Sequence, residues 1–599
     1  MSELAAPAAA AGAGSAARSP LTTGLSAPPR ARGRPPAWLL TAALGVVYLI
    51  IAPASPDLAA ASYRSWLFAH FGFQLWDNSW YGGHHLLAYS LLAPALSALI
   101  GPRVLAALSM TIATALFERL IRPSFPARAS AIAALWFAIG ASVGLLSSRV
   151  PFDLGLALGL AAALLARRAL GADGERGGGS ARRPGALLRA RRARAHTAPA
   201  GRAGRGALAG ALVLAATCSL ASPVAGAFLA LAMLACALAG RARTRASALT
   251  LAALAPIALL AFVFPEGGDQ PFVASAFYPA LLGVLVIAAL VPREQRILRT
   301  GTALYALVLI GAYLVPSAVG GNADRLGSLA AGPVAACVLA GGGRLRGPAA
   351  GARRTRLLAL LAPVLLYWQV NAPAADFAAA SSNPSVNASY YAPLLRELRA
   401  LGIGYGARPA RIEVVPTAAH WEARWVAPHV TLARGWERQL DSYRNSLFYG
   451  AGAHVTAARY RAWLLEQAIS YVALPDAKLD YSATAEARLL RGGAPPYLRE
   501  VWRSAHWRLF AVRDPQALAQ APARVQQLGV DSLTLWAPRP GSYTVRVRFT
   551  PYWAITAGAG CVAPGGGQWT QIRARRAGEL RLAIRFSLTR IFERGRRCT

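Results

Sequence analysis

The chain has 599 residues, of which 55% are hydrophobic, and its mean hydropathy is +0.37. This composition is too apolar for a soluble protein and indicates a polytopic membrane protein. The formal net charge is +37, carried almost entirely by arginine because Lys478 is the only lysine. The arginines lie in short loops between apolar segments, where they indicate which side of the membrane each loop faces. We therefore exclude a nucleic-acid partner. The excess of Arg, Ala and Gly is typical of a GC-rich bacterial genome.

The N-terminal region predicts a tail followed by a membrane anchor. Residues 1–36 are rich in Ala, Pro and Arg, which predicts a disordered cytoplasmic tail. Residues 37–54 are apolar and approach the ~20 residues that cross a bilayer, so we read them as a retained span. Residues 55–102 form a long first outer loop that is rich in aromatic, acidic and histidine side chains. We expect its last part, residues 86–101, to lie along the membrane surface instead of crossing.

Ten further apolar segments bring the predicted number of spans to eleven. They are residues 103–121, 129–147, 152–169, 207–221, 223–239, 246–264, 273–291, 301–319, 327–341 and 357–372. Alternate loops are basic and share the side of the N-terminal tail, and they include a Gly- and Arg-rich insert at 170–206 that we predict to be disordered and cytoplasmic. If 86–101 crossed the membrane, this separation of charge would be lost. A transmembrane domain over 37–372 follows.

The region after residue 372 is predicted to be extracytoplasmic. Residues 373–520 mix amphipathic helical patterns with short strand-like runs and predict an α/β domain. Residues 521–599 alternate apolar and polar side chains between Gly/Pro turns and predict a small β-sandwich. Outside the cell, Cys561 and Cys598 are expected to form a disulfide. No motif of a soluble enzyme is present, so the chemistry is assigned to the membrane domain.

The order of features in the first outer loop resembles the GT-C superfamily of membrane glycosyltransferases. One span is followed by Asp57, an amphipathic helix, the Trp-rich turn "WDNSWYGG", a Pro-bearing surface helix and another span. A second acid, Asp153, follows in "SSRVPFD". The resemblance covers roughly 37–372. It departs from many members, which have a Pro-Pro pair where this chain has only Pro94 and a paired acid where Asp57 stands alone.

The resemblance implies an enzyme of the plasma membrane that moves a sugar from a polyprenyl-phosphate donor to a cell-envelope glycan or lipid acceptor. In that family an acid just after the first span is catalytic, which points to Asp57 as the general base and to Asp153 as a second acid. Such a base takes the proton of the attacking hydroxyl. The alternative for Asp57 is the N-cap of its own helix.

Arginines near these acids are candidates for binding the donor phosphate, because a guanidinium matches phosphate bidentately. Arg149 is the first candidate, and its alternative is a salt bridge with Asp153. Arg325 is the second, and its alternative is a capping arrangement in which Asn322 or Asp324 starts the next helix.

The remaining candidates lie in the Trp-rich turn. His84 and His85 are candidates for binding a metal or the acceptor, against the alternative of solvated interfacial histidines. Trp76, Trp80 and Tyr81 are candidates for stacking on sugar rings, against the alternative of an aromatic belt at the headgroup level. A divalent metal would help to stabilise the departing phosphate, but no Cys/His spacing of a structural zinc site is present.

Two other classes of function compete with the enzyme. A secondary transporter or flippase would show internal repeats and charged or broken helices at the bilayer midplane. The sequence shows no repeat and almost no charge within its apolar segments. A non-catalytic envelope protein that binds glycan through its outer domain is the third class. The sequence favours the glycosyltransferase.

Overall fold

The computed structural model describes residues 34–599 except 172–197, 241, 342–349, 406–407, 451–454, 593–597 and 599. The predicted cytoplasmic tail, apart from its last three residues, and most of the predicted insert at 170–206 lie outside the described residues.

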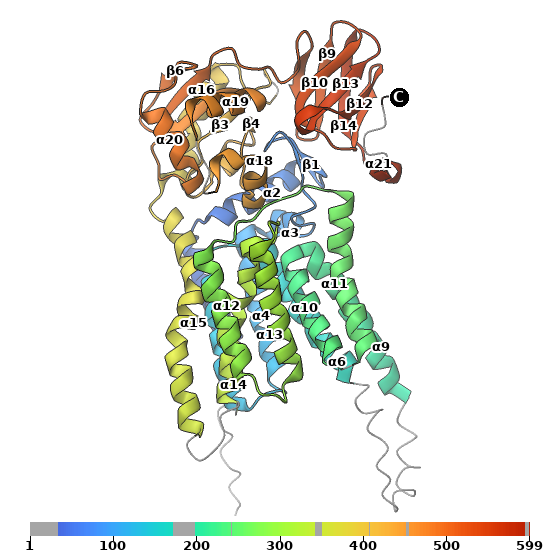
Figure 1. Cartoon of the computed structure of the whole chain (residues 1–599), viewed down its shortest axis with the longest axis vertical. Coiled ribbons are helices and arrows are strands. Elements are labelled where there is room, and N and C mark those ends of the chain that lie inside the picture. Colours follow the sequence, from blue (N-terminus) through green and yellow to red (C-terminus); the bar gives the residue numbers. More distant parts are fainter. Residues whose placement is uncertain are drawn as a thin grey trace, which may run out of the picture. The chain divides into compact units, whose positions relative to one another are not determined.

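Each of the eleven apolar segments contains a helix, and these helices stand side by side (Figure 1). Their bounds are α1 (Trp38–Ile51), α4 (Pro102–Ile121), α5 (Ala127–Gly144), α6 (Val150–Gly171), α9 (Ala198–Ala221), α10 (Pro223–Leu238), α11 (Arg243–Val263), α12 (Ala274–Leu290), α13 (Arg296–Leu314), α14 (Asp324–Ala340) and α15 (Ala350–Ala380). Eight helices of the described chain are long and apolar enough to cross a membrane, whereas α1, α10 and α12 are shorter. A polytopic α-helical membrane protein is therefore confirmed, and the count of eleven crossings stays a prediction.

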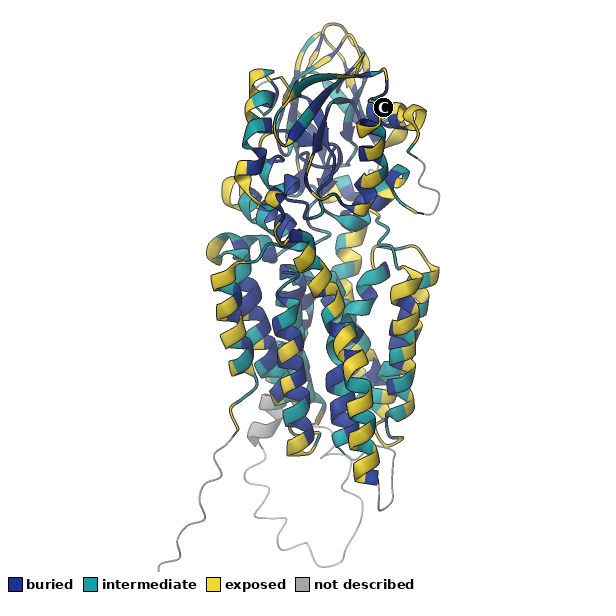
Figure 2. Cartoon of the chain, turned by 90° about the vertical axis from the view of Figure 1, so that its left-hand side faces the viewer, coloured by how far each residue is buried: buried dark blue, intermediate teal, exposed yellow. Residues whose placement is uncertain are grey.

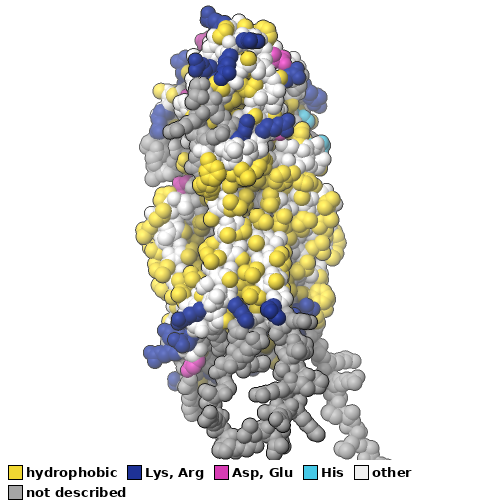
Figure 3. Space-filling view, turned by 90° about the vertical axis from the view of Figure 1, so that its right-hand side faces the viewer, with side chains coloured by type: hydrophobic (Ala, Val, Ile, Leu, Met, Phe, Trp, Pro, Cys, Tyr) yellow, Lys and Arg dark blue, Asp and Glu magenta, His cyan; other side chains and the backbone are white. Residues whose placement is uncertain are grey.

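The outer surface of the helical bundle is hydrophobic, as contact with the hydrocarbon core of a bilayer requires. Figure 2 shows exposed residues on the outward-facing parts of the helix ribbons and buried residues on the inward-facing parts. Figure 3 shows a broad hydrophobic band with Lys and Arg side chains gathered at its two boundaries. Among the described loops and helix ends of the bundle, those at one end carry most of the arginines, and we call this the basic end. The C-terminal domains are at the other end, which we call the sheet end.

The first loop at the sheet end is only partly helical. It contains α2 (Pro56–Phe71), the short strands β1 (Trp76–Asp77) and β2 (His84–His85), and α3 (Ala93–Ile100). At 1.5 Å per residue, the eight residues of α3 rise about 12 Å, too little to cross a ~30 Å hydrocarbon core. The predicted helix over 86–101 is thus confined to its second half. Pro94 stands in the first turn of α3, and Gly101 ends it with φ +86°.

Two predicted boundaries are corrected. Helix α15 continues past the expected end at residue 372 to Ala380, because Pro373 bends or weakens a helix but does not forbid its next turn. Helix α9 begins at Ala198, inside the segment predicted to be a loop, because Ala and Arg are good helix formers. The first correction places Asp376 on the last spanning helix.

The α/β domain is built on a five-stranded sheet in the order β4-β3-β5-β7-β6. The first three strands pair in parallel, and β7 pairs antiparallel with β5 on one side and with β6 on the other. Its strands are β3 (Arg411–Val414), β4 (Thr431–Leu432), β5 (Ile469–Pro475), β6 (Leu498–Arg503) and β7 (Trp507–Val512). Its helices are α16 (Ala388–Ala400), α17 (Glu422–Trp425), α18 (Arg438–Arg444), α19 (Ala457–Glu466) and α20 (Thr484–Arg491). The predicted α/β character is confirmed.

The last region is a β-sandwich. Its two sheets have the orders β11-β14-β9-β8 and β10-β13-β12, and inward-facing residues of both sheets share one hydrophobic core. The elements are β8 (Arg524–Leu528), β9 (Ser532–Ala537), β10 (Gly541–Arg548), β11 (Trp553–Ala557), β12 (Gly560–Pro564), β13 (Trp569–Ala574), β14 (Gly578–Ile584) and the short helix α21 (Leu588–Phe592). The predicted disulfide between Cys561 and Cys598 is present, with the two Cα atoms 5.4 Å apart.

Candidate functional site

The carboxylate of Asp57 faces a cavity because another residue caps its helix. Ser55 is the N-cap of α2, and its hydroxyl accepts a hydrogen bond from the backbone N–H of Leu58 at 3.3 Å. The Ser55 hydroxyl also donates to the carbonyl of Ser147 at 2.9 Å, which fixes the start of α2 against the loop between α5 and α6. Asp57 is therefore not the N-cap, and its side chain lines the cavity, 27% exposed.

Arg149 joins Asp57 to an acid that lies over 200 positions further along the chain. The Arg149 Nε is 3.4 Å from Asp57 Oδ2, and its Nη2 is 3.1 Å from Asp376 Oδ2. The Ser147 hydroxyl donates to the same Asp376 oxygen at 2.6 Å. One guanidinium thus orients two carboxylates from two different helices. The alternative considered for Arg149, a salt bridge with Asp153, is absent from the ion pairs of the described chain, which join Arg149 to Asp57 and Asp376.

Asp153 and Arg325 line the same cavity without a charged partner in contact. Asp153, in the first turn of α6, is 1% exposed, and its Oδ2 has no hydrogen-bond partner. Arg325 is the second residue of α14, and its guanidinium lies 5.5 Å from the centre of the Phe152 ring. The Asp324 carboxylate accepts from the Trp368 indole at 2.9 Å, and no side chain caps α14. Within the described chain, Arg325 is left with no ion pair.

The cavity is amphiphilic. Its volume is 1330 Å³, and its charged lining includes Asp57, Arg149, Asp153, Arg325 and Asp376. Its apolar walls come from α10, α11 and α13 and include Leu231, Leu254, Ile257, Leu260, Leu304 and Leu307. Leu254 is 42% exposed and Leu307 is 64% exposed. The cavity therefore offers an apolar surface for a hydrocarbon chain next to a cluster of charges.

The α/β domain supplies one side of this cavity. Four consecutive residues, 436–439, line it beside the helices of the bundle. Glu437 pairs with Arg64 of α2 at 2.5 Å, and the Gln439 amide donates to Glu437 Oε1 at 2.9 Å. Buried arginines pair with carboxylates only at good geometry, and here the pair joins the first loop to the C-terminal region.

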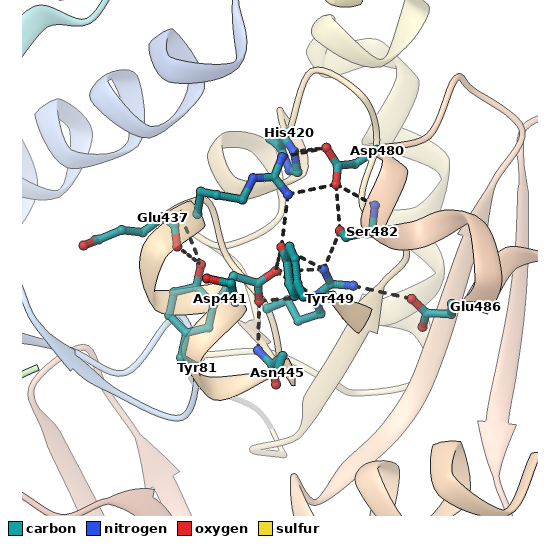
Figure 4. Close-up of polar contacts among 12 residues, drawn as sticks. Tyr81, His420, Glu437, Asp441, Asn445, Tyr449, Asp480, Ser482 and Glu486 are labelled. Atoms are coloured by element: carbon teal, nitrogen blue, oxygen red, sulfur yellow. Dashed lines mark hydrogen bonds and ion pairs between the residues drawn. The ribbon is translucent and has the colours of Figure 1, made fainter. Parts of the chain in front are cut away.

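A buried polar network holds the segment 436–439 in place (Figure 4). The Arg438 guanidinium binds both oxygens of Asp480, at 2.9 and 2.7 Å. The His420 imidazole is 3.2 Å from Asp480 and stacks on Trp436 with ring centres 3.6 Å apart. Although burial opposes the charge, the bonds from His420 and Arg438 hold the pKa of Asp480 well below its usual range.

A second arginine organises the centre of the same network. Arg434 is 3% exposed and donates to Asp441 Oδ2 at 2.7 Å and to the Ser482 hydroxyl at 2.8 Å. Two further carboxylates, Glu413 and Glu486, lie 3.9 and 3.7 Å from its Nη1. Burial raises the pKa of Glu486 to about 7, because desolvation penalises the charged form more than Arg434 favours it.

The chain is similar to two glycosyl-transferring enzymes of known structure. Arabinofuranosyltransferase AftD from mycobacteria matches 80% of this chain at 17% identity with a TM-score of 0.42, and this chain covers 40% of AftD. Archaeal oligosaccharyltransferase AglB from Archaeoglobus fulgidus, in complex with an inhibitory peptide and a dolichol-phosphate, matches 78% at 13% identity with a TM-score of 0.45. This chain covers 79% of AglB. No family model and no curated protein matches it.

The aromatic and histidine candidates of the first loop lie outside this cavity. None of Trp76, Trp80, Tyr81, His84 and His85 lines the cavity, and each is at most 5% exposed. They are buried between the loop and the C-terminal domains, so no ring face is open to a sugar. A role in stacking on sugar or in binding the acceptor stays a prediction, and in this structure the five side chains are neither solvated nor part of an aromatic belt.

Their contacts explain the burial. Trp80 stacks between Tyr63 and His84, with ring centres 4.5 and 5.6 Å away. The Tyr81 hydroxyl accepts from the backbone N–H of Glu437 at 3.0 Å. Burial without a hydrogen-bond partner lowers the pKa of His84 to about 3, so this imidazole is neutral.

Contacts of the same kind hold Trp76 and His85. The Trp76 indole donates to Asn78 at 2.7 Å. The His85 Nδ1 is 2.6 Å from Glu266, and its Nε2 is 2.9 Å from the Thr550 hydroxyl of the sandwich. These bonds tie the short β1–β2 hairpin to two different regions of the chain.

The donor set does not match a metal site. Within the described chain no group of three or more His, Cys, Asp or Glu side chains converges as metal ligands. The carboxylates of Asp57 and Asp376 both bind the Arg149 guanidinium. We therefore assign no residue to a divalent metal, which the sequence left open, and route no step through one.

Sequence reasoning missed Asp376 and Glu437. Asp376 follows the last apolar segment, in "NAPAADF", where it was counted with the soluble region. Glu437 stands in "RGWERQLD", far from any span. The signal available for Asp376 was an acid within one helical turn or two of a spanning segment, which marks a functional site by default.

Proposed function

We propose that this chain is a GT-C-type glycosyltransferase. It transfers a sugar from a polyprenyl-phosphate donor to a cell-envelope glycan or lipid on the outer face of the plasma membrane, with the C-terminal domains outside the cell. The observation that carries the proposal is the amphiphilic cavity. Its charged residues suit the binding of a phosphate and a reacting hydroxyl, and its apolar walls suit contact with a polyprenyl chain. A ligand that combines a long hydrocarbon with an anionic head uses both parts.

Asp57 is the proposed general base. The acceptor hydroxyl attacks the anomeric carbon of the donor sugar, its proton passes to an Asp57 oxygen, and the bond between the anomeric carbon and the phosphate oxygen breaks. The products are the glycosylated acceptor and polyprenyl phosphate. Arg149 and Asp376 orient the Asp57 carboxylate, because the guanidinium holds one oxygen of each acid.

Arg325 is the proposed ligand of the donor phosphate. Arg149, the other candidate, already binds two carboxylates, whereas Arg325 lines the cavity without an ion pair in the described chain. A guanidinium stabilises the negative charge that grows on the departing phosphate. Asp153 is kept as the second acid, in the wall of the cavity one turn after Arg149.

The direct test is transfer by purified protein in liposomes. The protein is supplied with radiolabelled polyprenyl-phosphate arabinose or mannose and with extracted envelope glycolipids as acceptors. We expect label in the acceptor fraction, and none with protein-free liposomes. If labelled donor binds and crosses the bilayer without any transfer, the chain is a flippase and not an enzyme. If it binds neither donor, the glycan-binding alternative replaces the proposal.

A further inference from the structure

The C-terminal end of the sandwich exposes large apolar side chains. Phe586 is 49% exposed, Leu588 is 69% exposed and Phe592 is 76% exposed. Leu588 and Phe592 are four positions apart on α21 and so share one face of this short helix. Such side chains gathered on one short segment mark a surface that contacts something other than water.

This segment adjoins the lipid-facing wall of the bundle. The Phe592 ring is 6.4 Å from the ring of Phe262, which lies at the end of the spanning helix α11. Phe262 is itself 49% exposed, and Leu259, one turn earlier on α11, is 61% exposed. Figure 1 shows α21 beside the upper end of α11. The apolar surface of α21 therefore continues the surface that α11 presents to hydrocarbon.

The segment is held in this orientation by the sandwich. Ile591, in the same helix, is 6% exposed and belongs to the sandwich core. The Arg590 guanidinium donates to the carbonyl of Trp553 at 2.9 Å, and Phe586 packs near Phe264 at 6.1 Å. One side of the segment is thus fixed, and the other side is turned away from the protein.

Its charge suits a headgroup layer. Two arginines of the described segment, Arg585 and Arg590, accompany the exposed apolar residues. Apolar side chains beside arginines are the composition of segments that lie in the membrane interface, where the apolar part enters the acyl boundary and the cations meet acidic headgroups.

We propose that residues 586–592 insert into the bilayer interface at the sheet end and anchor the β-sandwich to lipid. The occupant of this surface is the bilayer itself, because the surface is continuous with the lipid-facing wall of α11. The anchor is independent of the proposed enzymatic function. It would hold the sandwich at a fixed height over the membrane.

Photocrosslinking in nanodiscs tests the contact. The full chain carries p-benzoylphenylalanine at Phe592 or Leu588, in nanodiscs of phosphatidylcholine and phosphatidylglycerol with a fluorescent phospholipid. The matched control carries it at Trp536, an exposed aromatic residue of the same sandwich that is 36% exposed. We expect lipid adducts at 588 and 592 and background at 536. Adducts at background level in all three positions, or adducts to a second protein chain, would overturn the proposal.

Hydrogen exchange gives a second readout that needs no label. In the variant with Leu588→Ser and Phe592→Ser, amides of 586–592 should exchange at least about tenfold faster than in the natural chain in nanodiscs, because burial of each side chain is lost. In detergent-free protein held by amphipathic polymer without lipid, the two proteins should exchange alike. Equal rates in nanodiscs would refute insertion. Intact mass confirms that the Cys561–Cys598 disulfide still forms in the variant.

Discussion

The hydroxyl of Ser55 caps α2, and this single hydrogen bond leaves the neighbouring carboxylate of Asp57 available to the cavity. Arg149 then sets the direction of that carboxylate while also binding Asp376. Arg149 and Arg438 of the cavity lining form ion pairs, whereas Arg325 has none in the described chain. At the level of single residues, the site therefore contains an acid, Asp57, whose direction is set by Arg149, and a cation, Arg325, that is available to an anionic ligand.

The first prediction concerns Asp57. Asp57→Asn keeps the shape of the side chain but cannot accept a proton, so transfer in the liposome assay should fall by ~10²–10⁴-fold. The unfolding temperature should stay close to that of the natural chain, because Ser55 remains the N-cap. Glu579→Gln, an exposed acid of the sandwich, is the matched control and should transfer normally. A fully active Asp57→Asn protein would remove Asp57 from the mechanism.

The second prediction concerns Arg325. Arg325→Gln removes the charged partner of the donor phosphate, and a hydrogen bond to a charged group contributes about 1.5–3 kcal/mol. Binding of polyprenyl phosphate, measured by scintillation proximity, should therefore weaken by about 10- to 150-fold. Arg575→Gln, on the exposed surface of the sandwich, controls for the loss of one positive charge. Unchanged binding by the Arg325 variant would move the phosphate to another residue.

At the scale of elements, the β1–β2 hairpin connects different parts of the chain. Gly83 adopts φ +115°, and a Cβ there would meet the Trp76 ring at 2.3 Å, so the "WYGG" turn requires glycine at this position. The carbonyl of Gly83 accepts from Arg444 at 2.7 Å, and that of Gly82 accepts from the Arg548 backbone at 2.7 Å. The hairpin thereby joins the bundle to the α/β domain and the sandwich together.

The third prediction uses the buried imidazole of this hairpin. The pKa of His84 is about 3 in the folded chain and ~6.5 in an unfolded one. Below pH 6.5 the unfolded chain binds the proton more readily, so the stabilisation present above pH 6.5 is lost as the pH falls toward 3. The loss should reach about 2 kcal/mol at pH 5.

His84→Phe, which keeps the stacking on Trp80, removes this dependence. We therefore expect the unfolding temperature of the variant, relative to the natural chain, to rise as the pH is lowered from 7.5 to 5. The comparison between the two proteins matters because Glu486, with its pKa raised to about 7, adds a dependence of opposite sign that both share. A constant difference across this range would show that His84 is not buried as the structure has it.

At the scale of the whole molecule, the bundle and the C-terminal domains share their polar contacts. Arg64 pairs with Glu437, and Arg444 pairs with Glu266 of the loop between α11 and α12, each at 2.5 Å. The Tyr552 hydroxyl donates to the carbonyl of Val263 at 2.7 Å. Two regions of the C-terminal half, the α/β domain and the sandwich, therefore bind the sheet end of the bundle.

The fourth prediction concerns the side of the membrane on which the sheet end lies. By the positive-inside rule, the Arg-rich loops at the basic end predict that this end lies in the cytoplasm. Alkaline phosphatase fused after residue 450 should be active, whereas the same reporter inserted within 170–206 should be inactive. A fluorescent reporter that folds only in the cytoplasm should give the reverse pattern. Alkaline phosphatase activity within 170–206 would invert the topology and move the cavity to the cytoplasmic face.

Local patterns in the sequence were enough to predict the class of the molecule. Span length, hydropathy and the placement of arginines are local properties, so they predicted the eleven helices and the two distinct ends of the bundle. Strand alternation and turn residues predicted the α/β domain and the sandwich for the same reason. Asp57 was found because its position, directly after a span, is a local signal.

Which residues share the cavity depends on long-range packing and could not be predicted from local patterns. Asp376 meets Arg149 across 227 positions, and Glu437 meets Arg64 across 373. No local pattern encodes such a meeting, because it depends on how helices and domains pack. The same long-range packing buries His84 and its aromatic neighbours under segments far away in the chain. Burial is a property of the folded whole, since the side chains that exclude water from a residue come from elsewhere in the sequence.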